Sequence, residues 1–151
     1  PDYIIDTFKN LLSNKWGVIA AILVAAVTEE IFFRGIILTG LKNNYGDWLG
    51  ILFSALLFAL IHVIPWQVFP AFIAGIFLGW LYIKFESIIL CICVHSFNNV
   101  IAALPEYYNI NIPGIVYDIK AGVQFQPVWL DLFGILMFIY GIYLINRKIY
   151  L

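Results

Sequence analysis

The chain has 151 residues, of which 64% are hydrophobic, 18% aromatic and only 11% charged, and its net charge is −1. A soluble globular domain is closer to half apolar and a quarter charged, so this composition excludes an ordinary soluble domain and predicts an integral, multi-pass membrane protein. The near-neutral charge, without a basic patch or a Gly-rich phosphate loop, excludes a nucleic-acid partner. The length suits a single domain, residues 1–151.

Five apolar segments are predicted to be spanning helices, which need about 20 largely apolar residues each. In chain order they cover residues 16–41, 48–64, 66–83, 87–104 and 127–146. The breaks between the first four are short, which makes consecutive helices antiparallel neighbours. Residues 105–126 are interpreted as an interfacial loop. The sequence therefore predicts an all-α fold, a polytopic transmembrane helical bundle with about five spans.

The third predicted span carries a stripe of small residues at four-residue spacing, Ala71, Gly75 and Gly79. Small residues at this spacing allow another helix to approach closely. We favour packing against a helix of the same chain over a homodimer interface, and the oligomeric state stays open.

The first predicted span contains three charged residues, within the stretch AAVTEEIFFRGIIL at 25–38. A charged side chain in mid-membrane costs about 2.5–3.5 kcal/mol even on the mildest scale, so each one needs a partner or a hydrated cavity. Glu30 and Arg34 are four residues apart, which predicts an ion pair along one helix face. Glu29 is rotated by about 100° from Glu30 and is left without a partner on that face.

The other polar candidates are the two histidines, His62 and His95, and Asn99, which shares a helix face with His95. With a rise of about 1.5 Å per residue, Glu29 and His95 lie roughly 20 and 18 Å from the membrane face at which the first span begins. His62 and Asn99 lie roughly 9 and 12 Å from that face. Four polar residues from three helices are thus predicted between mid-membrane and one face, and we interpret them as one site.

This set of side chains suits hydrolysis of an acyl bond, most naturally a peptide bond. A Glu29 carboxylate away from bulk water can act as a general base, and a histidine beside it can hold the same water. A second histidine and an amide donor on a neighbouring helix can stabilise a developing oxyanion. No nucleophilic side chain is required, and neither Ser54 nor Ser96 has an obvious local partner.

Three alternatives stay open at this point, whereas an aspartic-protease-like dyad of Glu29 and Glu30 is disfavoured because adjacent helical positions diverge. Glu29, His62 and His95 could bind Zn²⁺ with water as the fourth ligand, although the sequence has no His-Glu-x-x-His pair. Intramembrane Glu and His residues also form proton relays in transporters, but those have helices broken by Gly or Pro near mid-membrane. In the third alternative, a non-catalytic scaffold, the polar cluster only locks helices together.

The sequence resembles the CAAX-protease and bacteriocin-processing (CPBP) intramembrane proteases, also called the ABI family, which include the type II CAAX prenyl endopeptidases. The three motifs of that family occur in order over about residues 25–100. Glu-Glu-x-x-x-Arg, Phe-x-x-x-His and His-x-x-x-Asn match, in turn, Glu29, Glu30 and Arg34, then Phe58 and His62, and then His95 and Asn99.

The resemblance implies an intramembrane protease domain and a role for each matched residue. Glu29 would activate water with assistance from His62. His95 and Asn99 would stabilise the tetrahedral intermediate. The supporting residues would be Glu30, Arg34 and Phe58. We favour a site without metal or another cofactor, with zinc on Glu29, His62 and His95 as the alternative.

The resemblance also implies a setting for the protein. The expected partners are membrane lipid and a membrane-associated peptide or protein substrate, prenylated CAAX-type peptides among them, and the expected location is a prokaryotic plasma membrane. Because some relatives serve in bacteriocin self-immunity, a non-catalytic scaffold or immunity protein is the alternative. Family members usually carry further helices before the first motif, so we expect this chain, which starts at Pro1, to lack N-terminal helices.

Overall fold

The computed structural model describes residues 2–62, 65–108, 110 and 127–147. These residues are almost entirely helical, and no strand occurs among them, which confirms the predicted all-α fold. The chain divides into two units, Pro1–Tyr107 and Tyr108–Leu151. All residues predicted for the site lie in the first unit.

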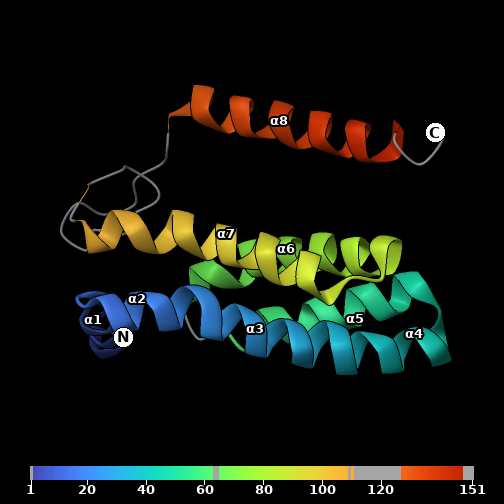
Figure 1. Ribbon diagram of the computed structural model, residues 1–151, viewed down its shortest axis with the longest axis horizontal. Helices are drawn as coiled ribbons and strands as arrows, with labels where there is room; N and C mark the ends of the chain where they lie inside the picture. Colours follow the sequence, from blue (N-terminus) through green and yellow to red (C-terminus); the bar gives the residue numbers. More distant parts are fainter. Residues whose placement is uncertain (1, 63–64, 109, 111–126, 148–151) are drawn as a thin grey trace. The chain divides into compact units, whose positions relative to one another are not determined.

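The first unit is a series of helices joined by short connections (Figure 1). After the first helix, α1, one continuous helical run extends from Lys15 to Tyr45 and alternates between α and π geometry. The elements in chain order are α1 (Asp2–Leu12), α2 (Lys15–Ile19), the π-helix η1 (Ala20–Val24), α3 (Ala25–Glu30), the π-helix η2 (Ile31–Leu38), α4 (Thr39–Tyr45), α5 (Asp47–Leu60), α6 (Pro65–Phe85) and α7 (Ile88–Tyr107). The second unit contains α8 (Val128–Arg147).

Within the described part of the chain, four helical segments are long and apolar enough to cross a membrane. They are Lys15–Tyr45, Gln67–Phe85, Ile88–Pro105 and Val128–Arg147. The remaining predicted span, 48–64, corresponds to α5, whose 14 residues make it too short to cross a hydrocarbon core about 30 Å thick by itself. The expected set of about five apolar helices is therefore present, and the chain is an integral membrane protein.

Two prolines were expected to mark helix ends, and the structure shows a helix boundary at one of them. Pro65 is the first residue of α6, a position at which the missing N–H of proline costs nothing. Helix α7 continues through Pro105 to Tyr107, so the start of the predicted loop at 105–126 is helical instead. Residues 111–126 of that predicted loop lie outside the described residues.

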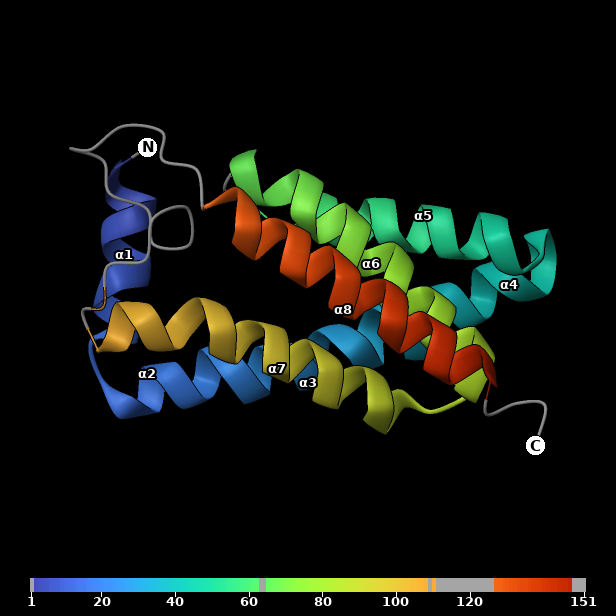
Figure 2. The same ribbon diagram turned by 90° about the horizontal axis from the view of Figure 1, so that it is seen from above.

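Helices α5 and α6 lie side by side in the first unit (Figure 2). A Cβ atom added to Gly75 would lie 3.0 Å from the Cα of Ala55, and one added to Gly79 would lie 3.2 Å from the side chain of Ile51. The absence of a side chain at these two positions is what allows the two helices to approach closely. The predicted packing of the small-residue stripe within the chain is confirmed.

Replacing Gly75 with Val is expected to lower the free energy of unfolding by about 1–3 kcal/mol, because the added methyl groups overpack the contact with α5. Unfolding in detergent micelles measures this loss. The matched control is Gly141→Val in α8, where an added Cβ has nothing within 4 Å. Equal losses in the two variants would contradict the close approach of α5 and α6.

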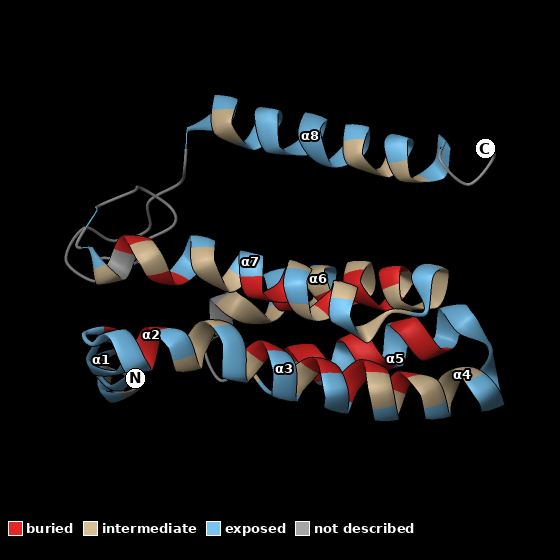
Figure 3. Cartoon of the chain, in the orientation of Figure 1, coloured by how far each residue is buried: buried red, intermediate tan, exposed pale blue. Residues whose placement is uncertain are grey.

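Buried residues gather where the helices of the first unit face one another, and the outer surfaces carry exposed apolar side chains (Figure 3). On α5, for example, Phe53, Leu56 and Leu57 are exposed, whereas Ser54, Ala55 and Phe58 are buried. The described residues of α8 include none that is buried. Such apolar exteriors are expected for helices surrounded by lipid instead of water.

Candidate active site

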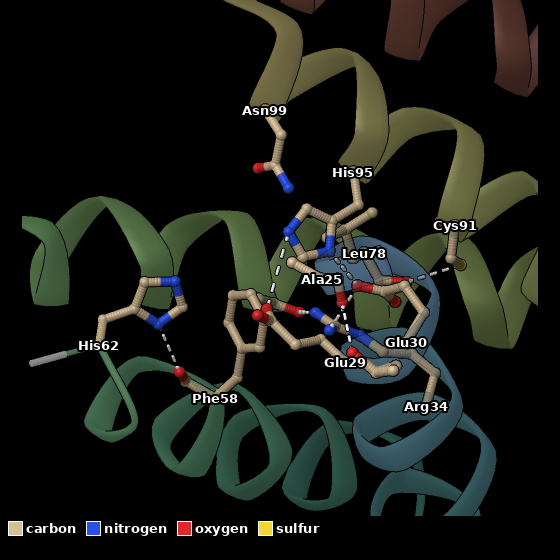
Figure 4. A network of polar contacts seen from close by, with 12 residues as sticks. Ala25, Glu29, Glu30, Arg34, Phe58, His62, Leu78, Cys91, His95 and Asn99 are labelled. Atoms are coloured by element: carbon tan, nitrogen blue, oxygen red, sulfur yellow. Dashed lines mark hydrogen bonds and ion pairs between the residues drawn. The ribbon is translucent and has the colours of Figure 1, made fainter. Parts of the chain in front are cut away.

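Glu30 and Arg34 form a fully buried pair at the centre of the site (Figure 4). Nη1 of Arg34 donates a hydrogen bond to Oε1 of Glu30 at 2.9 Å, which confirms the ion pair predicted from their spacing. Nη2 of Arg34 donates to the backbone carbonyl of Gly75 at 3.1 Å. The guanidinium also lies 4.7 Å from the centre of the Phe58 ring, so Phe58 supports the arginine through a cation–π contact.

His95 on α7 lies between the two glutamates of the first motif (Figure 4). Its Nδ1 is 2.7 Å from Oε1 of Glu30. An ionised carboxylate only accepts hydrogen bonds, so Nδ1 carries the hydrogen in this contact. The other ring nitrogen, Nε2, lies 3.8 Å from Oε2 of Glu29. Glu30 therefore fixes the orientation of the imidazole, and the opposite nitrogen faces the second acid.

Glu29 is the accessible member of the acidic pair. Its side chain is 25% exposed, whereas that of Glu30 is 0% exposed. Glu29 lines an open hollow of about 350 Å³ together with Thr28, Phe32, Phe33 and Ile61. The separation of the two acids onto different faces, expected from the helical rotation between them, thus gives one acid a sealed environment and the other an open one.

His62 is held near the end of α5, on the ring of Phe58. Its Nδ1 donates to the carbonyl of Phe58 at 2.9 Å, and the two rings are 4.9 Å apart. The Phe58 ring also contacts the ring of His95, at 5.6 Å. The described residues contain no hydrogen bond between His62 and Glu29. His95 is therefore the histidine that faces Glu29, as their similar predicted depths suggested, although the resemblance gave the assisting role to His62.

Asn99 lies one turn beyond His95 on α7, as the motif predicted. Its Nδ2 donates to the carbonyl of Ala21 at 3.1 Å, in the π-helix η1. A side-chain amide has two hydrogens on this nitrogen, so one remains for another acceptor. The contact ties Asn99, a predicted oxyanion donor on α7, to the first span.

The side chains named as alternative zinc ligands, Glu29, His62 and His95, do not converge in this arrangement. The Nδ1 atoms of the two histidines are bonded to Phe58 and Glu30. Among the described residues, no group of three or more His, Cys, Asp or Glu side chains is arranged to hold a metal ion.

These features define the class of protein: an integral membrane bundle of apolar helices with a carboxylate–imidazole cluster buried between its helices. The family model described as type II CAAX prenyl endopeptidase Rce1-like matches residues 11–101, which is more than half of the chain. The chain belongs to this family of CAAX-type intramembrane proteases, and the resemblance drawn from the three motifs is confirmed. No curated protein and no solved structure matches the chain.

Proposed function

We propose that the protein is an intramembrane endopeptidase in which Glu29 activates water to hydrolyse a peptide bond. The substrate is a prenylated CAAX-type peptide or another membrane-associated peptide. The observation that carries the proposal is the contrast between adjacent acids: Glu30 is sealed and paired with Arg34, whereas Glu29 borders the hollow and faces Nε2 of His95. A general base must reach both water and substrate, and Glu29 meets this requirement.

In the proposed reaction, a water in the hollow beside the Glu29 carboxylate attacks the carbonyl carbon of the scissile bond and gives a proton to the carboxylate. The C–O bond forms as the carbonyl becomes a tetrahedral oxyanion. When the C–N bond breaks, the proton held by Glu29 passes to the leaving amine. The products are a new carboxyl group and a new amino group, and the enzyme returns to its starting state.

Two donors on α7 are proposed to stabilise the oxyanion. In its doubly protonated form, His95 donates from Nδ1 to Glu30 and can donate from Nε2 to the substrate. Asn99 offers the amide hydrogen that is not bonded to Ala21. His62, which is held on the Phe58 ring at the end of α5, is proposed to assist Glu29. Preorganised donors of this kind stabilise charge that develops in the transition state.

The proposal is tested with the full chain reconstituted in phospholipid vesicles. The probe is an internally quenched peptide that ends in a farnesylated CAAX box, and the reaction is run in H₂¹⁸O. We expect an increase in fluorescence and a cleavage product whose new carboxyl group contains one ¹⁸O from water. Absence of cleavage, with intact helical structure by circular dichroism, would contradict the proposed function, and protein-free vesicles provide the control.

A non-catalytic scaffold or immunity protein is the second candidate, because members of the polar cluster also link helices. Arg34 bonds to α6, and His95 and Asn99 bond from α7 to the first span. Under this alternative, the probe is not cleaved, and substitutions in the cluster change the stability of the protein and not a catalytic rate.

A further inference from the structure

The helical run that carries the two acids changes from α to π geometry directly after Glu30. The π-helix η2 covers Ile31–Leu38 and includes Arg34. In π geometry the N–H groups bond five residues back instead of four, which widens the helix and shifts the residues that follow relative to the preceding turn. Such segments are rare, so specific contacts are needed to hold this one in place.

Two backbone carbonyls within η2 accept hydrogen bonds from side-chain hydroxyls. Oγ1 of Thr39, one turn further on, donates to the carbonyl of Arg34 at 2.9 Å. Oγ of Ser54, on α5, donates to the carbonyl of Phe33 at 3.0 Å. A carbonyl oxygen has two lone pairs, so each hydroxyl adds a second hydrogen bond to a carbonyl of the widened turn and stabilises that turn. The Ser54 bond is buried and joins two helices, so it also fixes η2 against α5.

The contacts of Arg34 depend on the geometry of this turn, because Arg34 follows Phe33 directly. From its place in η2, the guanidinium reaches Oε1 of Glu30 at 2.9 Å. The same Oε1 atom lies 2.7 Å from Nδ1 of His95. A shift of the backbone at Phe33 is therefore transmitted through the arginine and the buried acid to the imidazole.

We propose that Ser54 is a positioning residue of the active site: its hydroxyl holds η2 in register and thereby sets the orientation of His95. The inference rests on the proposed function. Ser54 is not placed to act as a nucleophile, because its side chain is 3% exposed and its hydroxyl is donated to a backbone carbonyl.

The first test is Ser54→Ala, which removes the donor and leaves the Phe33 carbonyl buried. With the farnesylated quenched peptide and the full chain in vesicles, we expect kcat to fall by about 10- to 100-fold, the size of effect that a displacement of about 1 Å produces. KM is expected to stay close to that of the wild type. Ser54→Cys has a side chain of similar size with a weaker hydrogen-bond donor. Its kcat is expected to lie between that of the wild type and that of Ser54→Ala. An unchanged kcat in Ser54→Ala overturns the proposal.

A second readout does not depend on turnover. The chain has only two histidines, so ¹⁵N-histidine labelling in detergent micelles gives two sets of ring signals, which a His62→Gln variant assigns. We expect the Nδ1–H signal of His95, shifted downfield by its short bond to Glu30, to move upfield in Ser54→Ala. An unchanged signal overturns the proposal even where the protein is less stable. If the wild type cleaves no peptide, the proposed function fails, and this readout still decides the role of Ser54.

Ser96→Ala is the matched control. Ser96 is also a buried serine, it lies next to His95 on α7, and its hydroxyl has no hydrogen-bond partner among the described residues. This variant is expected to keep the wild-type kcat and the wild-type His95 signal. If Ser96→Ala changed kcat or the His95 signal as much as Ser54→Ala does, loss of any buried hydroxyl would explain both results. The positioning role of Ser54 would then be overturned.

Discussion

Glu29→Gln is expected to lower kcat for the farnesylated peptide by about 10²- to 10⁴-fold, the usual contribution of a general base. The amide keeps the size of the side chain and its place at the edge of the hollow, but it cannot take the proton from water. KM is expected to change little, because the apolar lining of the hollow, including Phe32 and Ile61, is untouched. Steady-state rates in vesicles, normalised to folded protein, measure the effect.

The control for this substitution is Glu86→Gln, at an exposed position between α6 and α7. It makes the same chemical change outside the site and is expected to keep the full wild-type rate. A Glu29→Gln protein that cleaves at the wild-type rate would rule out Glu29 as the base. A Glu29→Gln protein that is inactive only because it is unfolded would show lost helical content, which circular dichroism detects.

Arg34→Met is expected to lower the free energy of unfolding by about 3 kcal/mol, because it leaves the Glu30 carboxylate inside the bundle without its counter-ion. Glu30 is 0% exposed and Arg34 is 1% exposed, so solvent does not compensate for the loss. The hydrogen bond from Arg34 to the carbonyl of Gly75 is lost as well. Unfolding in mixed detergent micelles with increasing denaturing detergent measures the change.

Two further variants test whether the loss of stability arises from the unpaired Glu30 carboxylate. The double variant Glu30→Gln/Arg34→Met contains neither charge and is expected to regain a large part of the stability. Arg147→Met, which removes an exposed arginine at the end of α8, is expected to leave stability unchanged. If the double variant were less stable than Arg34→Met alone, the cost would not arise from an unpaired carboxylate.

The helices and the buried ion pair were predictable because both depend on local sequence. Apolar runs bounded by Pro65, Gly46 and similar breaks define the helices, and spacing by four residues brings Glu30 and Arg34 onto one face. The packing of the small-residue stripe within the chain followed from the same periodicity, and the structure identifies α5 as the partner helix. The family motifs then named the residues that gather around His95.

The detailed geometry of the site was not predictable, because it depends on contacts between distant segments. The π-helices have no sequence signature that the 3.6-residue period detects, and one of them is held by Ser54 from another helix. Depth along a span gives one coordinate only, so the predicted depths of roughly 9 Å for His62 and 18 Å for His95 did not show which histidine faces Glu29. The bond from Glu30 to His95 also joins residues that are far apart in sequence.

The short length of α5 affects how water reaches the Glu29 carboxylate. Fourteen residues of helix extend about 21 Å, less than the hydrocarbon thickness of an ordinary bilayer. Such hydrophobic mismatch is relieved by local thinning of the lipid. Ile61, directly after α5, borders the hollow at Glu29, so thinned lipid at this end of α5 would bring water close to the acid. Through its short length, α5 would thus supply Glu29 with the water that the proposed hydrolysis consumes.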